Sequence, residues 1–402
     1  MKKLVTNYLI RRTAKFIRKK RPKIVVVAGS VGKTSTTQAI AAVLREKYTV
    51  LATKNSYNTD LGVVMTIFGQ HIVTNPVAWL WLSLKVVVMS LGLPKHEVYV
   101  LELGADTPGE INRFAYLKPD MAVVTAIVPE HMEFFKTIEA VAQEELSVMR
   151  FTKLVLINKT MVAEEYIDSE CRRNDFSKIL LEYYSREDVK KFASNLKVVG
   201  EHSFDSVAAA ASVAGKFGFS DADTNAAIQK VEPQPGRMSK LKGVNWSTLI
   251  DDTYNASPDA VKAALDYIYS VDASQKLVLL GNMNELGEHS EIAHRDVGKY
   301  CNPKKLDAVF TLGAHSNKFL AAEAEKAGCK VIRCSSPNEA GEKIKEMLKP
   351  GAIVLLKGSQ NGVFAEEATK ALLANQEDVS RLVRQAGHWP KMKRRQFSDL
   401  SI

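Results

Sequence analysis

Cysteine is scarce in this sequence, and the few cysteines form no motif. Four occur among 402 residues, and no two of them make a C-x-x-C pair. A disulfide framework or a zinc ribbon is therefore not indicated, and buried, reduced thiols are expected. The N-terminus also lacks the uninterrupted apolar run of a secretory signal peptide. Together these absences predict a protein of the reducing cytoplasm.

Acidic side chains are missing from residues 1–23, which carry ten lysines and arginines. The whole chain has a formal net charge of +10, so the remainder is neutral overall. A nucleic-acid-binding body would show a basic face, and we therefore expect no nucleic-acid partner. Apolar side chains lie among the basic residues, which predicts a basic amphipathic helix: Leu4, Val5, Tyr8, Leu9, Phe16 and Ile17. Two interpretations are open: a helix lying on an anionic bilayer, or a solvated helix docked on the body.

Internal repeats and low-complexity tracts are absent, and the chain is too long for a single core. From residue 24 on, continuous apolar runs alternate with helical patterns, which is typical of parallel strands covered on both faces. We therefore predict an α/β protein in which a mostly parallel central domain is followed by a Rossmann-like α/β domain. The expected parts are a basic helix over 1–23, a central domain over 24–235 and a C-terminal domain over 236–402. Strands are expected at 24–28, 98–103, 121–127, 153–158, 248–251, 276–281, 307–312, 330–333 and 352–356.

Residues 76–93, within an apolar insert over 71–96, read PVAWLWLSLKVVVMSLGL. Lys85 lies at the centre of this run, where a charge would cost about 2.5–3.5 kcal/mol in a bilayer, so a membrane span is not expected. The segment is then a buried helix, a partner-binding hairpin or a surface that dips into lipid. Core packing is the preferred interpretation. Peripheral membrane contact through residues 1–21 and 76–93 is the competing one.

Residues 24–37, IVVVAGSVGKTSTT, carry the strongest functional signal. A buried strand that ends in glycines and opens a helix presents unbonded N–H groups at one point, which suits a phosphate. Lys33 adds a charge for β- and γ-phosphate oxygens, and the Thr34 hydroxyl can ligate Mg²⁺. Val27 stands where the full Walker pattern has glycine, so the match is to the shorter G-[ST]-x-G-K-T form. The predicted nucleotide-binding residues of this loop are Gly29, Ser30, Gly32, Lys33, Thr34 and Ser35.

Carboxylates and a histidine follow other predicted strands, at the edge where open α/β sheets bind ligands. Glu102 ends the run VYVLE, and a carboxylate there can hold a Mg²⁺ that bridges nucleotide oxygens. His131 follows the strand over 121–127, and Glu144 and Glu145 lie on the next expected helix. Together with the phosphate loop they suggest a site with two cations. The structural alternative is open for each of them: a lone glutamate often caps a helix, and a lone histidine is often a core residue.

Nine motifs, in the same order, resemble the Mur ligase family of ATP-dependent amide-bond-forming enzymes of peptidoglycan synthesis. The resemblance is to the MurF-type branch, which adds D-alanyl-D-alanine to UDP-N-acetylmuramoyl-tripeptide, and it covers roughly residues 24–360. The motifs are VAGSVGKTSTT, TKNSYNTDLGV, VLELGADTPGEI, PDMAVVTAIVPEHMEFF, HSFDSVAAAASVA, PQPGRM, IDDTYNASPDAV, LGNMNELGEHSEIAH and LLKGSQ.

The resemblance implies roles for the matching residues. Lys33 would bind the ATP phosphates, Thr34 and Glu102 would hold one Mg²⁺, and His131 would ligate a second metal. The reaction implied is transfer of the γ-phosphoryl group to a carboxylate, followed by attack of an amine on the acyl phosphate. In this step negative charge is spread over the phosphoryl oxygens, and Mg²⁺ and lysine stabilise that charge; a protein nucleophile is not needed. The other carried-over residues are Asn58 for the muramoyl peptide, Arg237, Asp252 and Asn255 for the nucleotide, and Lys357 and Ser359 for the incoming amine.

The chain departs from the family in three places. The family usually has a carbamylated lysine where Glu145 aligns, so we predict that Glu145 replaces it as a Mg²⁺ ligand; a shift of one residue would give that part to Glu144. Gln360 stands where arginine is common and Asn282 where aspartate is expected, which alters the amine contacts. Only residues 1–23 precede the central domain, far fewer than a UDP-binding domain needs. Three interpretations are open: UDP is bound differently, a partner protein supplies that site, or the donor substrate is not the usual nucleotide.

The predicted function is an ATP- and Mg²⁺-dependent ligase acting on a muramoyl-peptide nucleotide and a D-Ala-D-Ala type dipeptide. It is expected in the cytoplasm, or peripherally at the inner face of the membrane. A competing hypothesis is a non-catalytic or partner-dependent ATP-binding subunit like the MurT-type proteins, although these carry a cysteine cluster that this chain lacks. A membrane-surface scaffold would leave the phosphate loop without a purpose. Lys33, Thr34, Glu102 and His131 together favour a working ligase.

Overall fold

The computed structural model describes residues 2–53, 59–70, 76–92, 94–174, 179–190, 192, 195–360 and 362–397. The chain folds into two compact units. The first unit comprises Met1–Lys197 and His202–Glu232, and the second comprises Val198–Glu201 and Pro233–Ile402. Each unit is built around one six-stranded sheet.

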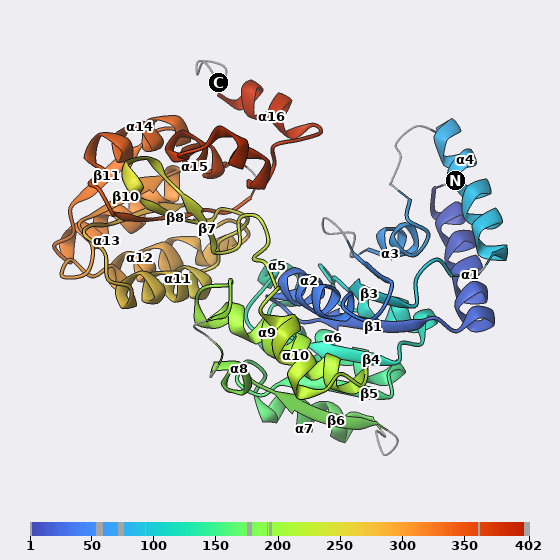
Figure 1. The fold of residues 1–402 in the computed structure, drawn as a ribbon. Coiled ribbons are helices and arrows are strands. Elements are labelled where there is room, and N and C mark those ends of the chain that lie inside the picture. The colour runs from blue at the N-terminus through green and yellow to red at the C-terminus, as the bar shows by residue number, and fades with distance from the viewer. Residues whose placement is uncertain are drawn as a thin grey trace. The chain divides into compact units, whose positions relative to one another are not determined.

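The sheet of the first unit is parallel throughout, in the order β2-β3-β1-β4-β5-β6. Its central strand β1 is buried from its second residue on, because helices cover both faces of the sheet, as the continuous apolar run predicts (Figure 1). The edge strands β2 and β6 were not expected from the sequence. The strands are β1 (Lys23–Ala28), β2 (Val50–Ala52), β3 (Val98–Glu102), β4 (Met121–Val124), β5 (Leu154–Asn158) and β6 (Leu180–Tyr184).

Ten α-helices and two 3₁₀-helices are described in the first unit. Helix α2 follows the phosphate loop and packs beside β1 and β3. Helix α6 begins after Thr137, whose hydroxyl accepts a hydrogen bond from the N–H of Ala140 and so caps the helix. The α-helices are α1 (Lys2–Lys20), α2 (Lys33–Leu44), α3 (Asp60–Ile67), α4 (Pro76–Leu91), α5 (Met132–Phe135), α6 (Ile138–Leu146), α7 (Glu164–Arg173), α8 (Glu187–Lys190), α9 (Glu201–Lys216) and α10 (Asp221–Ile228). The 3₁₀-helices are η1 (Ile111–Leu117) and η2 (Ser147–Phe151).

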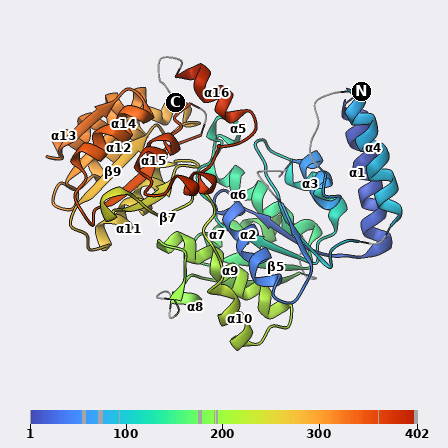
Figure 2. The same cartoon turned by 45° about the horizontal axis from the view of Figure 1, so that its top comes forward.

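The basic N-terminal segment is the helix α1, and it is docked on the body. Leu9, Phe16 and Ile17 are buried in the core of the first unit. Helix α4 lies beside α1 in both views (Figures 1 and 2), and its Leu82 and Val86 join the same core. The core-packing prediction therefore holds for one face of α4, whereas its other face is exposed. None of the helices in the described part of the chain has the length and hydropathy to cross a bilayer.

The sheet of the second unit has the order β11-β10-β9-β12-β8-β7, and only the edge strand β7 runs antiparallel to its neighbour. The strands are β7 (Ser239–Lys242), β8 (Thr248–Asp252), β9 (Lys276–Gly281), β10 (Ala308–Leu312), β11 (Val331–Cys334) and β12 (Ile353–Lys357). The α-helices are α11 (Pro258–Ser270), α12 (Ser290–Tyr300), α13 (Ala321–Lys326), α14 (Pro337–Met347), α15 (Glu366–Leu372) and α16 (Trp389–Gln396). Shorter turns of helix are η4 (Val244–Trp246), η5 (Gly287–His289), η6 (Ser316–Leu320) and η7 (Gln376–Arg381). The predicted α/β class with mostly parallel sheets is confirmed.

All four cysteines are free thiols, as expected. Cys301, Cys329 and Cys334 are buried, and Cys171 is half-buried. Burial raises the pKa of the Cys301 thiol to about 12 and raises that of Cys334 to about 11. At neutral pH these thiols are protonated and behave as small apolar side chains.

Candidate active site

The phosphate loop lies at the carboxyl end of the central strand β1, and it is held by the segment that follows β4. Gly29 and Gly32 have φ angles of +126° and +83°, and Gly32 precedes the first residue of α2. Thr125 donates its hydroxyl to the carbonyls of Ala28 (3.2 Å) and Val31 (2.6 Å). The loop therefore has a fixed shape before any ligand binds, with the start of α2 directed as an anion site requires.

Lys33 is surrounded by carboxylates at the carboxyl edge of the sheet. Its Nζ donates to the carbonyls of Gly29 (2.5 Å) and Ser30 (2.8 Å) and lies 3.5 Å from Glu130 Oε2. Burial alone would lower the pKa of Lys33, but the charges of the nearby glutamates outweigh it and raise that pKa. These glutamates are Glu130, Glu145 and Glu102. The lysine is charged at neutral pH, next to the loop that would hold phosphates.

Adjacent glutamates on α6 have separate tasks. Glu145 Oε2 accepts the N–H of Gly29 at 2.7 Å, so this carboxylate touches the phosphate loop. Glu144 instead accepts the N–H groups of Gly109 (2.6 Å) and Ile111 (2.7 Å). Burial raises the pKa of Glu145 to about 7, against the opposing effects of Lys33 and the Gly29 N–H. Of the two glutamates considered for the metal position, Glu145 is the one at the loop.

Glu102 and His131 lie near the same edge. Glu102 ends β3, beside Val27 of β1 in the register of the sheet, and it is buried. Its Oε2 has no hydrogen-bond partner among the described residues, which is a costly state for a buried carboxylate and suits a cation ligand. His131 has a left-handed backbone conformation (φ 50°), and its Nε2 lies 3.5 Å from Asp106 Oδ1 and 3.9 Å from Glu130.

Among the described residues, the predicted metal ligands Glu102, His131 and Glu145 do not form a complete metal-binding site. Within the described part of the chain, no group of three or more His, Cys, Asp and Glu side chains is spaced to hold a metal ion. Thr34 and Ser35 are half-buried at the start of α2. Asn58, predicted to line the muramoyl-peptide side, lies outside the described residues.

In the second unit, the predicted residues meet at the carboxyl ends of β8 and β12. Asp252 and Lys357 are opposite each other in the register, and Lys357 Nζ lies 2.5 Å from Asp252 Oδ2. The same Nζ donates to the carbonyl of Asn255 at 3.1 Å. Ser359 donates its hydroxyl to the carbonyl of Ala256 at 3.0 Å. Lys357 and Ser359, expected at the amine site, therefore also fix the turn that carries Asn255.

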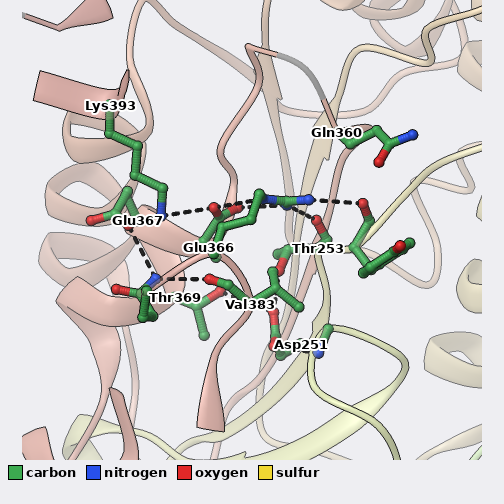
Figure 3. Close-up of polar contacts among 12 residues, drawn as sticks. Asp251, Thr253, Gln360, Glu366, Glu367, Thr369, Val383 and Lys393 are labelled. Carbon is green, nitrogen blue, oxygen red and sulfur yellow. Dashed lines mark hydrogen bonds and ion pairs between the residues drawn. The ribbon is translucent and has the colours of Figure 1, made fainter. Parts of the chain in front are cut away.

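A buried ionic network supports the same turn from the C-terminal side (Figure 3). Arg384 makes a bidentate pair with Glu366, at 2.9 and 2.8 Å, and donates to the carbonyls of Thr253 and Tyr254. Lys393 completes the network by pairing with both Glu366 and the neighbouring glutamate of α15. The guanidinium of Arg237, a predicted nucleotide contact, stacks 4.2 Å from the centre of the Tyr254 ring. Residues of α15 and of the C-terminal segment thus fix the turn that follows β8.

Asp251 is a further buried carboxyl beneath this turn (Figure 3). It accepts hydrogen bonds from the Thr253 hydroxyl (2.7 Å), the Gly236 N–H (3.1 Å) and the Thr369 hydroxyl (3.4 Å). Burial raises its pKa to about 7, and the negative charges of Glu366 and Asp252 add to that effect. This carboxyl joins three segments of the second unit.

Comparison with known proteins identifies the family. The Mur ligase middle domain matches residues 27–220, and the Mur ligase glutamate ligase domain matches residues 236–360. The chain belongs to the Mur ligase family. It is 27% identical, over 374 residues, to the UDP-N-acetylmuramoyl-tripeptide–D-alanyl-D-alanine ligase of Bacillus subtilis, with 87% of this chain and 76% of that protein aligned. The enzyme of the same name from Escherichia coli is 24% identical, over 90% of this chain and 79% of its own length.

Solved Mur ligase structures share the fold. MurF from Acinetobacter baumannii superposes with a TM-score of 0.71 at 20% identity, covering 92% of this chain and 81% of that one. MurF from Thermotoga maritima, solved in complex with ADP, gives a TM-score of 0.70 at 18% identity, covering 93% and 84%. At these identities the superpositions establish the architecture alone.

Several residues at these sites were not predicted from the sequence. Glu130 and Asp106 contact Lys33 and His131, and Thr125 fixes the phosphate loop. Glu130 could have been found, because it precedes His131 in a motif after a predicted strand. Asp106 and Thr125 also lie within the motifs, but their partners come from other strands and loops, so the motifs alone do not indicate which contacts they make. Arg384 lies outside the motifs, and its role appears only in its contacts.

Proposed function

We propose that this Mur ligase joins the carboxylate of a UDP-N-acetylmuramoyl-tripeptide to D-alanyl-D-alanine and converts ATP to ADP and phosphate. The observation that carries the proposal is the arrangement at the carboxyl edge of the first sheet. A preformed phosphate loop and a charged Lys33 lie next to three glutamates there. The relatives with this substrate pair in their names align over most of the chain. The first unit would be the ATP-binding domain and the second the C-terminal domain of the family.

The residues of the first unit suit phosphoryl transfer to a carboxylate. Lys33 and the N–H groups at the start of α2 would bind and orient the triphosphate, with Gly29, Ser30, Gly32 and Ser35 forming the cradle. The unsatisfied Oε2 of Glu102 fits a divalent cation, and Thr34, His131 and Glu145 are the other residues that would hold Mg²⁺. When bound, Mg²⁺ supplies charge neutralisation for the phosphate oxygens. Lys33 is held charged for the same purpose by its carboxylate neighbours.

The second unit would supply the remaining contacts. Arg237, Asp252 and Asn255 are proposed to contact the nucleotide, and their turn is fixed by Lys357 and Arg384. Lys357 and Ser359 are the proposed amine-site residues, and Asn58 is proposed for the muramoyl peptide. The enzyme would act in the cytoplasm, where ATP and nucleotide-linked precursors are available.

The experiment is a coupled assay of phosphate release with ATP, Mg²⁺, UDP-muramoyl-tripeptide and D-Ala-D-Ala. The proposal predicts release that requires both substrates and is abolished in Lys33→Ala and Glu102→Gln. Lys159→Ala, which changes a lysine outside the proposed site in the same unit, is the control and should retain activity. ATP binding without turnover on any muramoyl peptide would contradict the proposal.

A further inference from the structure

Helix α4 exposes four large apolar side chains on one of its sides. Trp81, Leu84, Val88 and Leu91 have exposed fractions of 66%, 53%, 60% and 68%. Their spacing places them on one side of an α-helix, over about 15 Å of its length. Lys85 is exposed within the same stretch. We call the four apolar residues the apolar stripe of α4.

The apolar stripe belongs to a helix that is firmly held. Leu82 and Val86, on the other side of α4, are buried in the core of the first unit. Arg12 of α1 donates to the hydroxyl of Ser90 at 2.8 Å, which ties the two helices together. The buried side of α4 therefore anchors the helix to the first unit, and the apolar stripe lies at a fixed position on the surface.

The neighbouring helix α1 presents a cationic face. Arg11, Lys15 and Arg18 are exposed, and their spacing places them on one side of α1. The two helices lie side by side in both views (Figures 1 and 2). Residues 1–45 and 61–96 contain no aspartate or glutamate, so no acidic side chain of these helices offsets the positive charge.

We propose that the apolar stripe of α4 and the cationic face of α1 dock the first unit on the surface of an anionic phospholipid bilayer. The apolar side chains enter the boundary between headgroups and acyl chains, and the basic side chains approach the lipid phosphates. Each basic side chain near such a surface strengthens binding about fivefold. A second copy of this chain is a poorer occupant, because pairing two stripes would crowd Lys85 and the cationic α1 of both copies. This proposal is independent of the ligase reaction.

The test is co-sedimentation of the full chain with vesicles made of equal parts phosphatidylglycerol and phosphatidylcholine, or of phosphatidylcholine alone. The expected result is binding to the anionic vesicles that weakens with salt, and little binding to the neutral ones. A stripe variant, W81Q/L84Q/V88Q/L91Q, should bind about tenfold or more weakly. These surface substitutions are preferable to removing α1, whose Leu9 and Phe16 are part of the core.

Matched variants separate local from general effects. R11Q/K15Q/R18Q removes three charges from α1, and K299Q/K304Q/K305Q removes three exposed lysines from the second unit. The first should weaken binding about a hundredfold, whereas the second should bind like the unchanged chain. Ile292→Gln, which removes an exposed apolar side chain of α12, should also leave binding unchanged.

Tryptophan fluorescence gives a second readout. It needs only single substitutions, so it does not depend on correct folding of the variants with three or four substitutions. Brominated lipids should quench emission in the unchanged chain, lose most of that quenching in Trp81→Phe and retain it in Trp246→Phe. Trp246 is 86% exposed in the second unit, so it tests whether any exposed tryptophan behaves in this way. Equal quenching in both variants would overturn the proposal.

Two further outcomes would also overturn it. One is recovery of the unchanged chain in the supernatant at every concentration of anionic vesicles. The other is a lipid-free dimer that the stripe variant converts to a monomer, with no vesicle binding by either form. The second result would assign the stripe to a second copy of this chain. Ligase activity in solution should be the same in the stripe variant, so failure here leaves the proposed reaction standing.

Discussion

Glu144 and Glu145 show how two adjacent carboxylates acquire different roles. Glu144 accepts two backbone N–H groups at the start of η1, and Glu145 accepts one from the phosphate loop. In Glu144→Gln one of the two N–H groups loses its acceptor, and we expect the free energy of unfolding to fall by about 1–3 kcal/mol. In Glu145→Gln the amide oxygen can still accept from Gly29, so stability should change little.

The same pair tests the proposed Mg²⁺ ligand. Glu145→Gln should raise the Mg²⁺ concentration needed for half-maximal turnover, because a neutral amide is a weaker ligand for a hard cation. Glu144→Gln should leave that requirement unchanged at a temperature where it is folded. Urea unfolding and Mg²⁺ titration of turnover measure the two effects. A higher Mg²⁺ requirement in Glu144→Gln alone would assign the metal position to Glu144.

Asp251 makes a prediction about pH. Its pKa is raised by burial from 3.8 to about 7 in the folded chain, so the folded state binds more protons than the unfolded state between these values. Its contribution to stability is present below pH 4 and is lost as the pH rises to about 7. Asp251→Asn should therefore make stability fall less steeply with pH across this window. Hydrogen exchange of the peptide containing β8, measured at pH 5 and pH 8, checks this, and an unchanged pH dependence would contradict it.

At the scale of elements, the turn between β1 and α2 depends on a glycine. A Cβ on Gly29 would lie 2.3 Å from Thr125 Oγ1 and 2.9 Å from the Ala126 backbone N, at a φ of +126°. Gly29→Ala should therefore shift the loop and abolish ATP binding. Gly109→Ala is the matched control, because Gly109 also has a positive φ of +89° but no described heavy atom lies within 4 Å of its Cβ position. Calorimetric titration with ATP measures both, and normal affinity in Gly29→Ala would refute the steric argument.

The C-terminal segment is tied to the second sheet by the Arg384–Glu366 pair. Arg384→Met leaves the buried Glu366 carboxylate with Lys393 as its remaining cation, and we expect a loss of about 3 kcal/mol of stability. The double variant Glu366→Gln with Arg384→Met removes the stranded charge and should recover part of that loss. Thermal unfolding measures both. A double variant less stable than the single one would show that the pair is not coupled in this way.

The sequence predicts the central strands better than the edges of the sheets. Residues 24–28 and 277–280 are continuous apolar runs, and these residues are buried in the central strands β1 and β9. The edge strands β2 and β6 are missed, since the first has three residues and the second is half-exposed. The strand β7 is missed because its burial alternates between lysines and apolar or small residues.

At the scale of the molecule, the sequence predicts those parts of the candidate site whose position follows from the order and direction of the strands. Parallel strands place Glu102, the phosphate loop and the segment after β4 at one edge, whatever the details of packing. The choice between Glu144 and Glu145 depends on the rotation of α6, which sequence spacing leaves open. The network around Arg384 depends on partners 18 and more than 100 residues away, and so has no local signature.

The central claim is that a carboxylate is activated by the γ-phosphoryl group of ATP. It is tested most directly by supplying UDP-muramoyl-tripeptide with ¹⁸O at both oxygens of its reacting carboxylate, together with ATP, Mg²⁺ and D-Ala-D-Ala. In the proposed reaction one carboxylate oxygen leaves with the phosphate, so we expect released phosphate that carries one ¹⁸O atom per amide bond formed. Amide formation with unlabelled phosphate, or phosphate release without any amide, would contradict it.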